Sequence, residues 1–317
     1  MEKILLKNSE LEKLTNEEKI KYYNNLKEYC KSLNNNLNIT KEQKLISNFS
    51  SKGRNYDYII RGFENIPSTG CILMCNHSNS HDALTPYEIL TNYNMPLSLL
   101  ISSEGLNPII IKLFKKANAT FVNRIDKKSR ENSIYELSSK VLNGGIGVVF
   151  GEGTWNLHPI KPMLNINKGI TTIAAITEKP IIPTIIEYVE SPLICKNEKE
   201  LYSRCIITFG KPITIFRDLD LIKQTALLQN KMEIMRRQGW EELGIRRNNI
   251  NDVNPILYVN HTWLKEYGPT GINYDTKRES KYLLSTDGSI VTNEYCIDEY
   301  GNFVPGELKR NMKIRGF

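Results

Sequence analysis

The chain has 317 residues, 40% hydrophobic and 24% charged, which is long and apolar enough to bury a sizeable core. Its net charge of +7 suits an anionic substrate or membrane surface, and no nucleic-acid-binding motif accompanies it. The six cysteines are scattered without zinc-type spacing, so we expect a reduced, intracellular protein with no metal. We find no apolar run of about 18 residues and therefore expect a cytoplasmic protein. Peripheral contact with the inner face of the cell membrane stays open.

Residues 1–48 are rich in Lys, Glu and Asn and carry apolar residues at near-helical spacing. This pattern predicts one or two amphipathic helices that either cap the core or lie on a membrane. Capping is favoured, because the polar face carries both charge signs instead of a basic stripe.

Residues 49–249 alternate between strand and helix patterns, which predicts an α/β domain with a mostly parallel central sheet flanked by helices. Pro183 lies within one apolar run and predicts a strand at a sheet edge or bulge. We expect strands at 55–63, 71–75, 97–101, 119–123, 146–150, 181–188 and 205–209, and helices at 87–93, 107–116, 129–142, 165–179 and 218–242.

From about residue 250 the composition changes, and residues 250–317 are expected to form a small β-rich extension. Asp287-Gly288 lies between two apolar runs, which is a strong hairpin signal, and a second possible hairpin surrounds Tyr300-Gly301. The sequence assigns this extension no function.

The polar segment after the apolar run 71–75 carries the most informative residues. Strand ends of this kind are where α/β proteins place their chemistry. Thr85, as an N-cap, with Pro86 signals a helix start, so His77 and Asp82 both precede the helix and can face each other. A carboxylate on one imidazole nitrogen would leave the other as a base. The alternative is a helix-entry loop with surface-exposed polar groups.

Two further strand ends carry charged residues. Arg124 follows a short strand and suits an anion such as a phosphate, although a solvated basic loop is an alternative. Glu152 lies between Gly151 and Gly153, where the backbone can approach a ligand closely. It would bind ligand hydroxyls or pair with Arg124; the alternative is an exposed glutamate on a tight turn.

In chain order, these segments resemble the four sequence blocks of the glycerolipid acyltransferase family, which includes glycerol-3-phosphate and 1-acylglycerol-3-phosphate acyltransferases. The matching residues are Asn76-His77-x4-Asp82, Phe121-x-x-Arg124, Phe150-Gly-Glu-Gly-Thr154 and Ile182-Pro183. The resemblance implies an O-acyltransferase of lipid metabolism and phospholipid biosynthesis. Such an enzyme moves a fatty acyl group from acyl-CoA or acyl-carrier protein to an acceptor hydroxyl and needs no other cofactor.

The resemblance also implies the roles of individual residues. His77 would be the general base and Asp82 would orient it. The remaining implied positions form the substrate-binding site: Asn76, Arg124, Glu152, Gly153, Thr154 and Trp155.

Two positions depart from the family pattern. Gly151 stands where the family usually has proline, which changes the turn. Trp155 stands where the family usually has arginine, so a donor to phosphate is replaced by an indole on which a sugar ring can stack. A phosphate-bearing lysophospholipid-like acceptor and a glycolipid or sugar acceptor therefore both stay open.

Two other functions compete with acyl transfer. A thioesterase- or esterase-type hydrolase would use His77 to activate water. A binding protein of the same fold would have lost the chemistry, although the intact His77 and Asp82 argue against this.

Overall fold

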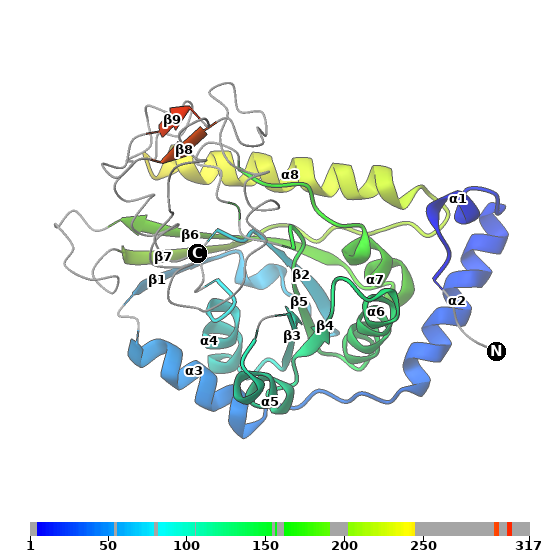
Figure 1. The fold of residues 1–317 in the computed structure, drawn as a ribbon, viewed down its shortest axis with the longest axis horizontal. Coiled ribbons are helices and arrows are strands. Elements are labelled where there is room, and N and C mark those ends of the chain that lie inside the picture. Colours follow the sequence, from blue (N-terminus) through cyan, green and yellow to red (C-terminus); the bar gives the residue numbers. More distant parts are fainter. Residues whose placement is uncertain are drawn as a thin grey trace.

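The structure, a computed structural model, describes residues 5–53, 56–78, 82–104, 106–153, 156, 162–190, 202–244, 295–297 and 303–305. Its centre is a seven-stranded sheet in the order β1-β7-β6-β2-β5-β3-β4 (Figure 1). The strands are β1 (Asp57–Arg61), β2 (Cys71–Cys75), β3 (Leu97–Ser102), β4 (Thr120–Val122), β5 (Ile146–Phe150), β6 (Ile181–Glu190) and β7 (Tyr202–Phe209). Every neighbouring pair in this sheet is parallel except β6 with β7, so the predicted mostly parallel α/β fold is confirmed.

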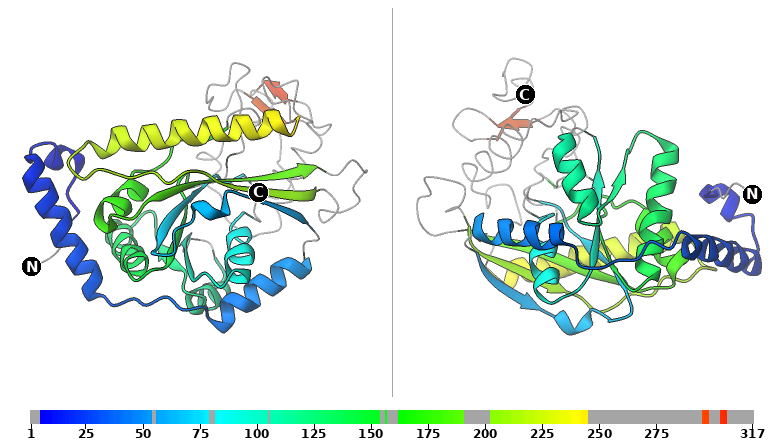
Figure 2. Two further views of the ribbon diagram at one scale, coloured as in Figure 1. Left: turned by 180° about the vertical axis from the view of Figure 1, so that it is seen from behind. Right: turned by 90° about the horizontal axis from the view of Figure 1, so that it is seen from below.

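Helices cover both faces of the sheet. The strands separate two buried cores. One core includes α2, α6, α7 and α8, and the other includes α3, α4 and α5. Figures 1 and 2 show α8 running along β6, and α2 lying beside α6 and α7. The helices are α1 (Asn8–Leu11), α2 (Asn16–Ser32), α3 (Lys41–Gly53), α4 (Thr85–Asn92), α5 (Pro108–Lys116), α6 (Lys127–Leu142), α7 (Gly169–Thr177), α8 (Leu221–Glu242) and the 3-10 turn η1 (Phe63–Asn65).

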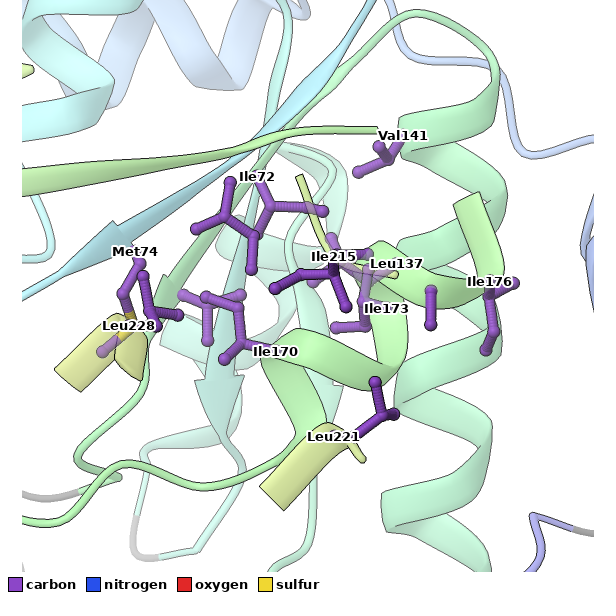
Figure 3. Close-up of a cluster of buried hydrophobic side chains, with 14 of the residues drawn as sticks. Ile72, Met74, Leu137, Val141, Ile170, Ile173, Ile176, Ile215, Leu221 and Leu228 are labelled. Atoms are coloured by element: carbon purple, nitrogen blue, oxygen red, sulfur yellow. The ribbon is translucent and has the colours of Figure 1, made fainter. Parts of the chain in front are cut away.

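Strand β2 shows why the site sits on a rigid support. All five of its residues are buried, because alternate side chains enter opposite cores. Ile72 and Met74 pack with helices α6, α7 and α8 (Figure 3), whereas Leu73 packs with α4 on the other face. Packing on both faces fixes where the strand ends and the polar loop begins.

The prediction that residues 181–188 form an edge strand is wrong, and the register shift that β6 does contain lies at Val189 and Glu190, away from Pro183. β6 lies inside the sheet, between β7 and β2. Pro183 is tolerated because it lies one residue before the ladder with β7, which begins at the pair Thr184 and Phe209. Its carbonyl oxygen still accepts a hydrogen bond from Gly210 N at 2.7 Å. The backbone N–H that proline lacks is therefore missing only at a position just before that ladder.

Thr85 is also not the N-cap that the sequence predicts. The cap is Leu84, which makes no side-chain capping bond, and the helix α4 already includes Thr85 and Pro86. The Thr85 hydroxyl instead lies 3.1 Å from the hydroxyl of Tyr188 on β6, and both side chains are buried.

The ends of the chain are partly described. Three helices, α1, α2 and α3, occupy the N-terminal region in place of the predicted one or two. The strands β8 (Tyr295–Ile297) and β9 (Phe303–Pro305) form the antiparallel hairpin predicted around residues 300–301, and the hairpin predicted at 287–288 lies outside the described residues. Among the helices that the structure describes, none is both long and apolar enough to cross a bilayer.

Candidate active site

The loop after β2 is anchored by Asn76. Its side-chain amide donates to Ile186 O at 3.0 Å and accepts from Ile186 N at 2.7 Å, which continues the β2–β6 ladder one step past the strand. The side chain is fully buried. In this position Asn76 fixes the start of the loop, and its predicted contact with a substrate stays a prediction.

His77 and Asp82 lie side by side. His77 Nδ1 is 3.3 Å from Asp82 Oδ2, and the same oxygen accepts a hydrogen bond from Ser78 N at 2.6 Å. The Asp82 side chain is fully buried, whereas 17% of the His77 side chain is exposed. The imidazole also packs on the Phe150 ring, with ring centroids 4.5 Å apart. This geometry holds Nδ1 toward the carboxylate and turns Nε2 away from it.

Glu152 holds the two loops of the site together. One carboxylate oxygen accepts from His77 N at 2.8 Å, and the other accepts from Leu164 N at 2.7 Å. The side chain is buried and is therefore not an exposed turn residue. Arg124 pairs with Glu104 instead of Glu152, so the predicted Glu152–Arg124 pair is wrong. Burial raises the pKa of Glu152 from 4.5 to about 8, against the opposing effects of the Leu164 N–H, the Arg236 charge and the His77 N–H.

This raised pKa predicts a pH dependence of stability. The folded chain holds the Glu152 proton more tightly than the unfolded chain, so the free energy of unfolding should fall as pH rises from about 4.5 to about 8. Glu152→Gln carries no titrating group and should make that fall shallower in chemical denaturation series at several pH values. An unchanged slope would show that Glu152 ionises normally in the folded chain.

Arg124 is committed to two partners. Its Nε and Nη2 donate to Glu104 Oε2 at 3.1 and 2.9 Å, and its Nη1 donates to Gly153 O at 2.6 Å. Gly153 has a φ of +69°, which favours glycine and turns this carbonyl toward the guanidinium. A Cβ at Gly151 would meet the end of the Met74 side chain, which would have to shift. Thr154 and Trp155 lie outside the described residues.

Arg236 is a site residue that the sequence analysis missed. It lies on α8 and donates to Ser78 Oγ at 2.6 Å and to Pro162 O at 2.5 Å, while pairing with Glu187 of β6. Only 2% of it is exposed. A signal existed: the buried residues Met232, Arg236 and Trp240 recur every four residues, so an arginine interrupts the apolar stripe of the helix.

The sequence model of the acyltransferase family matches residues 57–187. These residues belong to the acyltransferase family. The resemblance inferred from the four blocks is therefore confirmed, and the matched span contains His77, Asp82, Arg124 and Glu152 but not Arg236.

Among solved structures, the chain is similar to the 1-acyl-sn-glycerophosphate (LPA) acyltransferase PlsC from Thermotoga maritima. The identity is 21% and the TM-score is 0.48, over 64% of this chain and 80% of that chain. A comparison with curated protein sequences gives no match.

Proposed function

We propose that this acyltransferase-family chain moves a fatty acyl group from the thioester of acyl-CoA or acyl-carrier protein to an acceptor hydroxyl, with His77 as the general base. The observation that carries the proposal is the His77–Asp82 pair, with Nδ1 and Oδ2 3.3 Å apart at the end of a buried strand. A buried carboxylate beside Nδ1 favours the tautomer that is protonated there, which makes Nε2 a proton acceptor.

The proposed step is a direct transfer. Nε2 of His77 takes the proton of the acceptor hydroxyl while the hydroxyl oxygen attacks the thioester carbonyl. Collapse of the tetrahedral intermediate forms the ester and expels the thiolate, which receives the proton from the imidazolium. Cys75 is a poor alternative nucleophile, because it is fully buried and burial raises the pKa of its thiol well above the ordinary value.

The test is acceptor dependence. The purified chain is given acyl-CoA and increasing concentrations of lysophospholipid, glycerol phosphate or glycolipid acceptors, and thiol release is followed. The proposal predicts release that rises with acceptor and saturates. Release that ignores the acceptor would instead identify a hydrolase, and no release with any acceptor would favour a binding protein.

The pairing of Arg124 with Glu104 bears on the kind of acceptor. A free arginine at this position would suit a phosphate, but here the carboxylate of Glu104 occupies two of its donor nitrogens and neutralises its charge. A phosphate would have to displace or repel that carboxylate. We therefore favour an uncharged hydroxylated acceptor, which also agrees with Trp155 in place of the family arginine.

Glu104→Gln tests this preference. Loss of the carboxylate charge should leave Arg124 available to an anion and lower the KM for a glycerol-phosphate-type acceptor by about tenfold, with little change for an uncharged hydroxyl acceptor. Initial rates over a range of each acceptor give both values. If the native chain already prefers the phosphate-bearing acceptor and the Glu104→Gln variant does not, the preference for an uncharged acceptor is wrong.

A further inference from the structure

Three exposed isoleucines follow the neighbouring strands β3 and β4. Ile109 and Ile110, at the start of α5, are 75% and 40% exposed, and Ile125, in the turn before α6, is 85% exposed. The turn is fixed in this conformation: the Asn123 side chain accepts from Ile125 N, and Arg130 Nη1 donates to the carbonyl oxygen of Ile125. The exposure of Ile125 therefore belongs to a constrained turn.

These isoleucines lie at the catalytic edge of the sheet. β3 and β4 are adjacent and parallel, and Ser103 N still bonds Val122 O just past their ends. Ile109 follows the end of β3, and Ile125 follows the end of β4. Since β2, β5 and β3 are also parallel, the isoleucines lie at the same edge as His77 and Glu152.

Exposed basic side chains follow the isoleucines on helices α5 and α6. Lys112 on α5 and Lys127, Lys128 and Arg130 on α6 are all exposed. Lys127 also forms a surface ion pair with Glu131 at 3.6 Å, which offsets part of its charge. The nearby Asp126 caps α6 through the Lys128 and Ser129 N–H groups, so the helix N-terminus already offsets its charge. The ends of β3 and β4 therefore lead into segments that carry both exposed isoleucines and exposed basic side chains. We call the set Ile109, Ile110, Ile125, Lys112, Lys127 and Lys128 the docking tip.

We infer that the docking tip binds a bilayer that contains anionic phospholipid. The isoleucines would enter the interface between headgroups and acyl chains, and the basic residues would meet the headgroup phosphates, which is how amphipathic surfaces bind membranes. An acidic protein would also attract the basic residues, but it would not account for a constrained isoleucine that is 85% exposed. The inference rests on the proposed function insofar as docking brings a lipid acceptor to the catalytic edge.

The experiment is flotation of the full chain with vesicles of phosphatidylcholine alone or mixed with phosphatidylglycerol. We expect binding to the mixed vesicles, weakened by salt because the cationic contribution is screened. The variant Ile109→Gln/Ile125→Gln should bind at least about tenfold more weakly. The matched control is Leu227→Gln, which changes a 62% exposed leucine on α8 and should leave binding unchanged.

Each outcome has one meaning. Native-like binding by Ile109→Gln/Ile125→Gln, or an equal loss in Leu227→Gln, overturns the inference. A loss seen only in Lys127→Glu/Lys128→Glu also overturns it and points to an acidic protein partner. The chain with His77→Ala should bind vesicles normally, because docking needs no turnover. If the chain transfers acyl groups to a dispersed acceptor but does not bind vesicles, the membrane inference is wrong and the proposed function stands. If the chain binds vesicles but transfers no acyl group, the proposed function is wrong.

Discussion

Replacing His77 with alanine is expected to lower kcat/KM for acyl transfer by about 10²- to 10⁴-fold, the range typical for loss of a general base. The substitution removes the imidazole beside Asp82 and keeps the backbone N–H that donates to Glu152. The loop should therefore keep its position, and the loss should reflect proton transfer. Steady-state rates with saturating acyl-CoA and varied acceptor give the value.

The control for this variant is His261→Ala, which changes a histidine outside the family-matched residues and should keep native rates. Both variants should unfold near the native denaturant midpoint. If His77→Ala transfers acyl groups at the native rate, another group must take the proton, and the base assignment is wrong.

Arg236→Met is expected to cost about 3–5 kcal/mol of folding free energy, because it leaves the Glu187 carboxylate buried without its cationic partner. It also removes the donors to Ser78 and Pro162, which hold the loops on either side of His77. We therefore expect a lower kcat as well. Chemical denaturation measures the first effect and steady-state kinetics the second.

The double variant Glu187→Gln/Arg236→Met separates the two effects. Removing both charges should restore much of the lost stability, since an uncharged pair leaves no buried ion. It restores no donor to Ser78 or Pro162, so the kcat should stay low. Recovery of stability and kcat together would mean that Arg236 acts only on folding and does not position the loop.

The strands could be predicted because their signals are local. Residues 71–75 and 146–150 are short, fully apolar runs with polar ends, and both are strands with those bounds. The proximity of His77 and Asp82 followed from their shared place before a helix start, even though the cap itself was Leu84 and not Thr85.

The remaining site contacts could not be predicted because they join distant parts of the chain. Arg236 and Ser78 are 158 residues apart, and no local pattern pairs them. Arg124 could have paired with either Glu104 or Glu152 on charge alone, and the β3–β4 pairing decides for Glu104. The interior place of β6 depends in the same way on the strand order, which the position of one proline does not determine.

The most direct test of the account is nitrogen NMR of the chain labelled at histidine, with His77→Ala identifying the His77 signals. For the neutral form of the His77 imidazole, we expect the proton on Nδ1, facing Asp82, and Nε2 unprotonated. A proton on Nε2 in that state would leave His77 unable to take one from an acceptor and would contradict the account.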